Sequence, residues 1–301
     1  MQRHDVNTML LFLAVVEAGS FTLAAERLNM PKANLSRKIA QLEASVGITL
    51  LERTTRSQHL TEAGRNYLAH CREIKAQVEL ANAAVEKALN VVSGELKVGV
   101  SVGMGHEILK PVLSQFMHEN PQISMSLNLL NHRVDVIEEG FDLVIRIGTL
   151  EDSRLVAKRL GKVTRRLYSS PQYLERCAEV TGPDAISHLD VLLMSSIQTA
   201  QTMVLVNRQE TCEINIHPRM RVDDYVVLKQ MVIEGVGVAI LPDYMCQTAL
   251  GKDQLVQLLP DWQLPEVEVY ALYPKHRLNI PKVKTFVEFI QHVFTVRLNL
   301  S

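Results

Sequence analysis

Apolar positions near the start of the chain recur at the spacing of α-helices. The first stretch ends before Gly19, a residue that suits a helix C-terminus, and its apolar positions are Val6, Met9, Leu10, Leu13 and Val16. Ser20 is well placed to accept the free amides of a second helix, which we expect to run to about Leu28. The pattern therefore predicts two short helices in immediate succession.

A third helix is predicted after a turn at Asn29-Met30. Pro31 suits its first turn, because the missing N–H of proline would be unpaired there, and Gly47 ends it. One face is apolar and should pack on the first two helices; it comprises Leu35, Ile39, Leu42 and Val46. The opposite face is small or polar and comprises Ala33, Arg37 and Ala40, flanked by Asn34, Ser36 and Gln41.

Two short segments after the third helix, 48–51 and 59–61, are expected to pair as a small wing. A helix pair with a tight turn followed by a wing is typical of a winged helix-turn-helix, here assigned to residues 1–60. This interpretation makes double-stranded DNA the expected partner. The side chains expected to reach base edges are Asn34 and Arg37, and those expected on phosphates are Ser36, Lys38, Arg53 and Arg56.

Residues 61–92 contain no proline and predict one linker helix, with Thr61 as its N-cap and Glu62 favourable at the positive end of the helix dipole. Apolar and small residues step by four and three, which is typical of a short coiled-coil seam; the positions are Ile74, Val78, Ala81, Val85, Ala88 and Val92. A helix of roughly 30 residues is hard to bury against a small domain, so we expect a second copy of the chain to cover the seam. The alternative is that it packs on the C-terminal part of the same chain.

Strands and helices alternate after Ser93-Gly94, and residues 93–301 are expected to form a separate α/β domain. A βαβαβ pattern predicts a mainly parallel sheet with right-handed crossovers. Its strands are expected at 96–102, 123–130 and 141–147, and its helices at 108–117 and 134–139. Later strands are expected at 167–170, 191–194, 214–217, 238–241 and 267–273, with helices at 225–234 and 281–298. Two such lobes would leave a cleft at the strand ends, where small ligands usually bind.

Charge is distributed unevenly along the 301 residues. The chain has a formal net charge of −1, yet residues 27–65 carry seven basic and three acidic side chains, a net charge of +4. A local basic patch on a nearly neutral protein favours a bound polyanion over general stickiness, although a merely solvated face has the same composition.

Composition also limits location and chemistry. No apolar run approaches about 18 residues, and Asp5 and Glu17 flank the apolar N-terminal stretch, so we expect a cytoplasmic protein with no membrane partner. The four cysteines are scattered without metal-ligand spacing, and we expect free thiols, no metal and no cofactor.

Several segments together resemble the LysR-type transcriptional regulators. In the N-terminal third they are Gly19-Ser20-Phe21-Thr22, Ala24-Ala25-Glu26-Arg27-Leu28, Leu35-Ser36-Arg37-Lys38-Ile39, Gln41-Leu42-Glu43, Leu50-Leu51-Glu52-Arg53 and Leu60-Thr61-Glu62-Ala63-Gly64. Further along they are residues 142–148, 170–174 and 234–242. The resemblance covers the whole chain and implies a DNA-binding regulator that assembles as a dimer or tetramer.

The resemblance also implies that the C-terminal domain is a periplasmic-binding-protein-like effector domain. Its last strand and helix would return to the first lobe, giving lobe I as 94–164 with 268–301 and lobe II as 165–267. The chain departs from the family at the start of the recognition helix, where many members have Ser-Gln-Pro-Ala and this sequence has Pro31-Lys32-Ala33-Asn34. The family's base-reading positions therefore fall on Lys32 and Ala33.

Candidate effector contacts come from strand ends. Ser101 and Gly103 follow the first expected strand, and Asn131 and His132 follow the second. Arg146 lies in an otherwise apolar strand, where its guanidinium needs either an anionic ligand or an internal salt bridge.

Three further candidates come from the second lobe. The backbone around Gly237 offers either ligand-binding amides or tight packing. Gln201 and Thr202 are expected to face the cleft.

The motifs of common enzymes are missing from the sequence, including the P-loop, HExxH and GxSxG patterns. We therefore expect a non-enzymatic, sequence-specific regulator controlled by a small-molecule effector. One alternative is a thiol-based redox regulator on the same scaffold, using Cys246 or Cys212. Another is an α/β solute-binding protein or enzyme with an accessory basic module.

Overall fold

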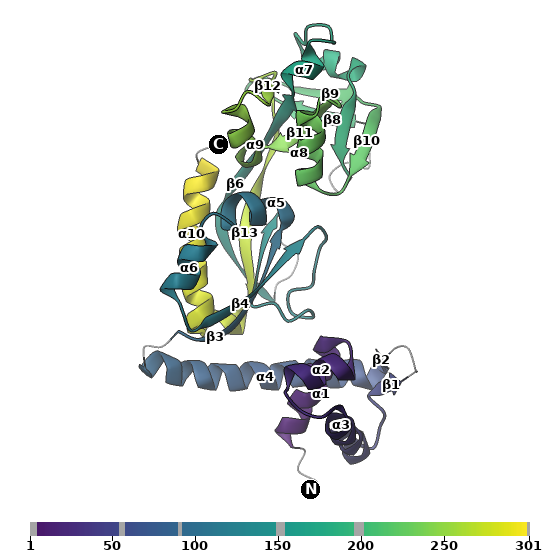
Figure 1. The fold of residues 1–301 in the computed structure, drawn as a ribbon, viewed down its shortest axis with the longest axis vertical. Helices are drawn as coiled ribbons and strands as arrows, with labels where there is room; N and C mark the ends of the chain where they lie inside the picture. Colours follow the sequence, from purple (N-terminus) through teal and green to yellow (C-terminus); the bar gives the residue numbers. More distant parts are fainter. Residues whose placement is uncertain (1–4, 54–57, 90–91, 149–153, 196–201, 300–301) are drawn as a thin grey trace. The chain divides into compact units, whose positions relative to one another are not determined.

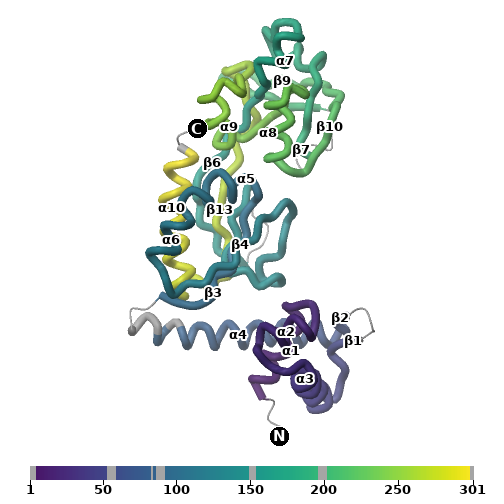
Figure 2. Tube along the Cα trace, viewed as in Figure 1, coloured from purple at the N-terminus to yellow at the C-terminus, as the bar shows by residue number. Residues whose placement is uncertain are grey.

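The computed structural model describes residues 5–53, 58–89, 92–148, 154–195 and 202–299 (Figures 1 and 2). The chain divides into two compact units, one built on residues up to 91 and the other on residues from 92 onward. We call them the N-terminal and C-terminal units and describe each by itself.

The N-terminal unit opens with the three expected helices, and its bounds are α1 (Val6–Ala18), α2 (Phe21–Arg27) and α3 (Lys32–Val46). Gly19 ends α1 in the left-handed region at a φ of 70°, and the Ser20 hydroxyl oxygen accepts the N–H of Leu23 at 3.1 Å. Both caps confirm the sequence prediction. Pro31 lies one position earlier than expected, as the N-cap residue of α3.

The core of this unit is formed by the apolar stripes of the three helices and the start of the next. Leu35, Ile39 and Leu42 of α3 are buried against α1 and α2, as predicted, together with Phe12 and Leu68. Within the described residues no single helix is long and apolar enough to cross a membrane; α1 and α2 reach that length and composition only as a pair bent by 118°.

The wing consists of β1 (Leu51–Arg53) and β2 (Gln58–Leu60), which pair antiparallel. The first strand begins three residues later than predicted. The reason is the Glu43 carboxylate, which accepts the N–H groups of Leu50 and Leu51 at 2.8 and 3.0 Å and so holds the preceding residues against α3.

The linker helix α4 runs over Glu62–Leu89. The Thr61 hydroxyl oxygen accepts the N–H of Gly64 at 2.9 Å, which confirms the predicted N-cap. The same hydroxyl donates to the carbonyl of Thr49 at 2.8 Å and thereby joins the helix start to the wing.

The C-terminal unit has a long mixed sheet in the order β10-β7-β11-β6-β13-β5-β3-β4, with β12 paired to β6. Lobe I contains three parallel strands, which confirms their predicted parallel pairing but not the helix expected between the last two; they are β3 (Gly94–Ser101), β4 (Ile123–Leu130) and β5 (Leu143–Ile147). Helices α6 (Leu113–Glu119) and α10 (Pro281–Asn299) lie together on this lobe (Figure 1), and Phe116 packs on Phe286 with ring centroids 5.0 Å apart.

The predictions of two helices in lobe I are wrong. The stretch 108–117 is not one helix, because Pro111 has no N–H to continue it; instead the chain forms α5 (Val102–Met104), the π-helical turn η1 (Gly105–Leu109) and then α6. The helix expected at 134–139 is replaced by turns at residues 136–140, and the Asp135 carboxylate accepts the N–H of Ile137 at 2.9 Å.

Among its described residues, lobe II contains six strands and helices that the sequence did not predict and four that it did. Those near the sequence expectation are β7 (Val191–Met194), β9 (Thr211–Asn215), β11 (Val238–Pro242) and α8 (Tyr225–Ile233). Those that the sequence reading missed are α7 (Pro171–Leu174), η2 (Pro183–His188), β8 (Thr202–Val206), β10 (Pro218–Val222), α9 (Asp243–Leu250) and β12 (Val256–Leu258).

Two long antiparallel strands connect the lobes, β6 (Leu155–Ser169) and β13 (Leu264–Pro274), the latter followed by η3 (Lys275–Asn279). The sequence predicted most of β13, at 267–273, but only the C-terminal end of β6, at 167–170. Strand β6 pairs with β13 as far as Arg165 and with β11 from Arg165 onward, so Arg165 lies where the strand passes from one lobe to the other.

Candidate nucleic-acid interface and ligand cleft

The outer face of α3 is exposed, because burial of its apolar stripe turns the opposite side to solvent. Lys32, Ala33 and Arg37 are exposed, and Asn34 and Lys38 are partly buried. The structure therefore places Ala33, Asn34 and Arg37 on the side of α3 opposite its buried stripe, with Lys32 and Lys38 at the edges of that stripe.

Two of these side chains contact each other. The Arg37 Nη2 group donates to Asn34 Oδ1 at 3.0 Å, one helical turn away. The contact holds the guanidinium over the helix surface. It uses one of the five N–H donors of the guanidinium. Ser36 is partly buried and also has an interaction within the protein.

The wing is only partly described. Arg53 ends β1 opposite Gln58, but its side chain and the whole of Arg56 lie outside the described residues.

The predicted seam of α4 changes character along the helix. Ile74 packs on the core of its own unit. Val78 and Val85 are 41% and 60% exposed, and Ala81 is exposed as well. The side chain of Ala88 lies outside the described residues. The distal part of the seam therefore presents apolar side chains that its own unit does not cover.

A cavity of about 330 Å³ lies between the lobes of the C-terminal unit. Five candidate residues from the sequence line it, namely Ser101, Gly103, Asn131, His132 and Arg146. Ser101 stands at the start of α5 without making a capping hydrogen bond, and His132 and Asn131 contact each other at 3.1 Å. Arg146 already has an interaction within the protein.

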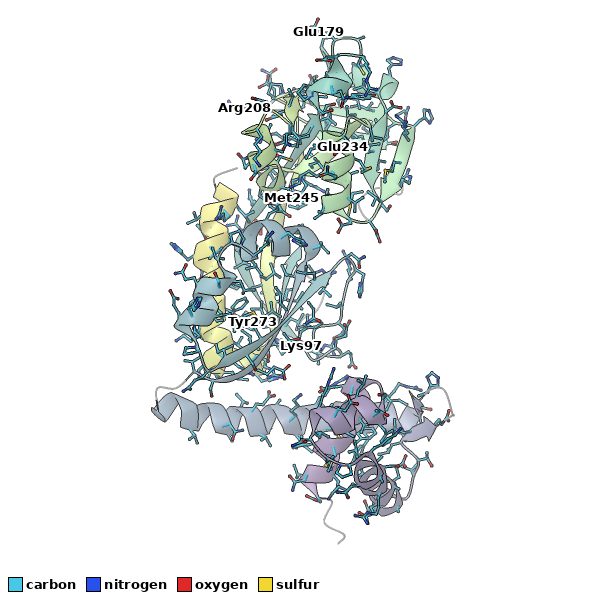
Figure 3. All side chains as sticks on the ribbon, in the orientation of Figure 1. Lys97, Glu179, Arg208, Glu234, Met245 and Tyr273 are labelled. Carbon is cyan, nitrogen blue, oxygen red and sulfur yellow. The ribbon has the colours of Figure 1, made fainter. Side chains whose placement is uncertain are left out.

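Gly103 is a glycine because the lobes approach closely at this point. A Cβ atom there would lie 3.0 Å from the Met245 sulfur and 3.3 Å from the Tyr244 hydroxyl. Figure 3 shows Met245 between the lobes.

The sequence analysis missed the wall that lobe II and the crossover strands contribute to the cavity. Its polar residues are Arg165, Asp223, Asp224, Tyr225 and Tyr244, and Arg133 of lobe I was missed as well. The ligand prediction rested on expected strand ends and on the family resemblance, and neither pointed to these residues.

Two of the described candidates, Gly237 and Thr202, do not line this cavity. Gly237 is packed tightly instead, since a Cβ there would lie 2.0 Å from the carbonyl oxygen of Asp190. Thr202 begins β8, which pairs with β9 in a separate two-stranded sheet. Gln201 lies outside the described residues.

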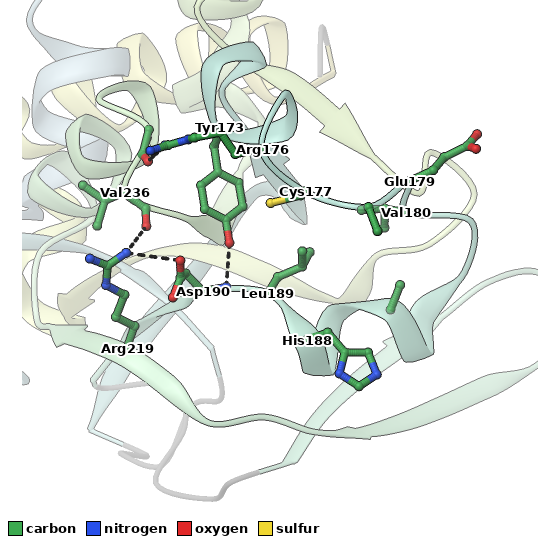
Figure 4. Close-up of a pocket in the computed structure, with 13 residues that line it drawn as sticks. Tyr173, Arg176, Cys177, Glu179, Val180, His188, Leu189, Asp190, Arg219 and Val236 are labelled. Atoms are coloured by element: carbon green, nitrogen blue, oxygen red, sulfur yellow. Dashed lines mark hydrogen bonds and ion pairs between the residues drawn. The ribbon is translucent and has the colours of Figure 1, made fainter.

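A second hollow of about 620 Å³ lies within lobe II (Figure 4). Its polar groups bond mainly to one another: the Tyr173 hydroxyl accepts the N–H of Asp190 at 2.7 Å, and Arg219 donates to the Asp190 carboxylate at 3.2 Å. Arg176 donates to the carbonyl of Gly235 at 2.8 Å. These polar groups therefore have hydrogen-bond partners within the protein and do not call for a ligand.

All four cysteines are free thiols. Burial raises the pKa of Cys71 to about 12 and raises that of Cys246 further. The pKa of Cys212 is also raised, first by burial and then by Asp184 and Glu210. A thiolate is therefore disfavoured at these sites. Among the described residues no group of three or more His, Cys, Asp or Glu side chains is arranged to hold a metal.

Two family models match the chain, one in each of its units. Residues 6–65 match a family model described as a bacterial regulatory helix-turn-helix protein of the lysR family, and residues 90–295 match one described as a LysR substrate binding domain. An HTH-type transcriptional regulator of Xanthomonas campestris is 34% identical over 99% of this chain and 87% of its own length.

Full-length solved structures are similar as well. The Vibrio cholerae virulence activator AphB has a TM-score of 0.62 at 28% identity and covers 95% of this chain and 98% of its own. CrgA, a LysR-type transcriptional regulator from Neisseria meningitidis, has a TM-score of 0.62 at 25% identity and covers 97% and 99%.

Proposed function

Because this chain belongs to the LysR family of bacterial transcriptional regulators, we propose that α3 reads DNA and that the cleft between the lobes receives the effector. The family supplies the general activity, which is DNA-binding regulation through an effector-binding domain. The proposal assigns residues of this chain to each step.

The exposed face of α3 supports the DNA assignment, and it is the observation that carries the proposal. Arg37 and Asn34 are assigned to base edges in the major groove, together with the positions of Lys32 and Ala33. Ser36 and Lys38 are assigned to phosphates, as are Arg53 and Arg56 of the wing.

The cleft supports a small anionic effector. Arg133, Arg146 and Arg165 line it among apolar side chains, and a compact cavity of about 330 Å³ suits a small organic molecule. Ser101, Gly103, Asn131 and His132 are assigned to the lobe I side of the bound effector. Binding would alter the closure of the lobes and so the DNA-binding state.

Self-association follows from α4 in this proposal. Val78, Ala81, Val85 and Ala88, with Ile74 at the base, form the seam between two copies. Two recognition helices then address two half-sites related by a two-fold axis. A tetramer would be a further assembly of such dimers. We further propose that the protein acts in the cytoplasm and catalyses no reaction.

The thiol-based alternative has less support. Cys246 is fully buried, and its raised pKa works against the thiolate that oxidation requires. An enzyme or solute-binding protein with an accessory basic module does not account for the full-length relatives, which are regulators.

The test is DNA binding to the region upstream of the protein's own gene, measured by fluorescence anisotropy at several salt concentrations. Arg37→Ala should weaken binding by about 1–3 kcal/mol and relax preference at one base position. Lys38→Ala should weaken all sequences alike and reduce the salt slope by about one. The matched control is Arg208→Ala in the C-terminal unit, an exposed arginine that should change neither property. Failure of the folded protein to bind any duplex at modest salt contradicts the proposal.

A further inference from the structure

We propose that Arg165 and Tyr225 together hold the carboxylate of an effector that is a small organic monocarboxylate with an apolar body. The inference rests on the proposed effector cleft and names the part of it that the sequence did not reveal.

Arg165 is a buried cation with an unused donor. Its side chain lines the cleft, yet the residue is only 9% exposed. One guanidinium nitrogen, Nη2, donates to the carbonyl of Pro265 at 3.0 Å, whereas Nε has no hydrogen-bond partner. A buried N–H of a charged group that lacks an acceptor is costly, so an acceptor is expected to arrive from outside the protein.

Tyr225 provides a second unused donor beside the first. It is the first residue of α8, and its buried hydroxyl makes no hydrogen bond of normal geometry. Burial raises the pKa of Tyr225 to about 12, while the charge of the Arg165 guanidinium and its approach to the phenol oxygen partly lower it. The phenol is therefore protonated at neutral pH and is able to donate.

These two groups are distinct from the other unsatisfied atoms of the described residues. Buried polar side-chain atoms without a partner also occur at Tyr67, Arg72, Asp142, Ser169 and Arg277, but none of those residues lines the cleft. Arg133 and Arg146 line the cleft too, but both have interactions within the protein.

Two acidic side chains also line the cleft, Asp223 and Asp224. The Asp224 carboxylate caps α8 by accepting the N–H groups of Val226 and Val227 at 2.7 and 2.9 Å. Asp223 is exposed. The Arg165–Tyr225 pair thus keeps a net positive charge, and the two oxygens of one carboxylate match its two donors.

The rest of the lining specifies the body of the ligand. Apolar side chains form part of the cavity wall, among them Val102, Leu130 and Val144, and the polar side chains of Asn131 and His132 lie beside them. The apolar part of the wall suits an apolar ligand body, and the unsatisfied pair of donors suits one carboxylate.

The position of Arg165 places the proposed carboxylate site at the strands that connect the two lobes. Its Nη2 bond to Pro265 joins the two crossover strands where β6 changes its pairing partner. A carboxylate on Arg165 and Tyr225 would therefore link a crossover strand to α8 of lobe II, while the ligand body contacts lobe I near Ser101.

The experiment measures binding of a panel of monocarboxylates of two to eight carbons, from acetate to benzoate and octanoate, to the full-length protein by calorimetry and thermal shift. Each acid is paired with its uncharged amide. At least one acid should bind, and its amide should bind at least tenfold more weakly. A panel in which no acid binds at 20 mM, or in which amides bind equally well, overturns the inference.

Tyr225→Phe removes only the donor hydroxyl. It should leave the melting temperature of the free protein equal or higher, since the lost group is unsatisfied, and weaken the acid roughly tenfold. Tyr67→Phe is the matched control, because Tyr67 has an equally unsatisfied buried hydroxyl in the N-terminal unit. Tyr67→Phe should likewise leave the melting temperature equal or higher, and it should leave the affinity for the acid unchanged.

Arg165→Gln and Arg146→Gln separate this inference from the proposed function. Loss of acid binding in Arg165→Gln and Tyr225→Phe supports the assignment. Loss in Arg146→Gln alone, with both other variants binding normally, places the anion elsewhere in the cleft and overturns the inference while the cleft assignment stands. DNA binding without effector tests the regulator function independently of all three.

Discussion

His276 shows at the residue scale how burial turns a side chain into a pH-sensitive element. It lies partly buried in η3. Its pKa is lowered from 6.5, first by burial and then by Arg277, with Asp142 opposing in part. The unfolded chain therefore takes up a proton at a higher pH than the folded protein does. Stability should fall as pH drops below about 6.5.

His276→Gln should remove this part of the pH dependence. Between pH 7.5 and 5.5 the melting temperature of the variant should fall less than that of the wild type, because glutamine has no proton to gain. The exposed His118→Gln is the control and should retain the wild-type profile. Parallel profiles for His276→Gln and wild type would contradict the assignment.

At the scale of the element, α4 combines two roles along one stripe. Its first turns pack on the N-terminal core through Leu68, Cys71 and Ile74. Farther along, Val78 and Val85 continue the same stripe but are exposed. A single helix that changes from internal packing to an uncovered apolar face is what a dimerisation helix requires.

Val78→Glu and Val85→Glu should each shift the protein toward monomers, because a buried carboxylate opposite its own symmetry mate is unfavourable. Sedimentation velocity measures the shift, and DNA affinity should fall with it. Ala84→Glu, an exposed position off the seam, should change neither. Unchanged mass for both seam variants would argue that this stripe is not the interface.

At the scale of the whole C-terminal unit, an ion pair connects the two lobes. The Lys229 ammonium of α8 lies 2.6 Å from the Glu107 carboxylate of η1, and it also donates to the carbonyl of Met245 at 3.0 Å. Both charged side chains are less than a third exposed. The pair is therefore positioned to stabilise the lobes in the arrangement described.

Lys229→Met should lower the free energy of unfolding by roughly 1.5–3 kcal/mol, the value typical of hydrogen bonds to charged groups. Hydrogen exchange in η1 and at the start of α8 should become faster. Combined with Glu107→Gln, the effects should be less than additive in a double-mutant cycle. Lys252→Met, at an exposed lysine of lobe II, is the control. Full additivity would show that the pair does not couple the lobes.

Errors in the expected elements came from competing local signals. The apolar spacing of 108–117 favoured a helix, but Pro111 interrupts the backbone hydrogen bonds. Strand β6 was underestimated, because exposed Lys158 and Arg159 obscure the alternation of apolar positions that marks a strand.

The sequence by itself determined the helix-turn-helix, its caps, the exposed face of α3 and the parallel order of β3, β4 and β5. These features depend on residues close together in the chain, so spacing and capping chemistry are sufficient. Only the tertiary structure decided the far wall of the cleft. Arg165, Tyr225 and the Glu107–Lys229 pair, whose members are 122 residues apart, acquire their roles from burial and from contacts between lobes. A charge or hydroxyl reveals such a role only after the fold has removed its water and its alternative partners.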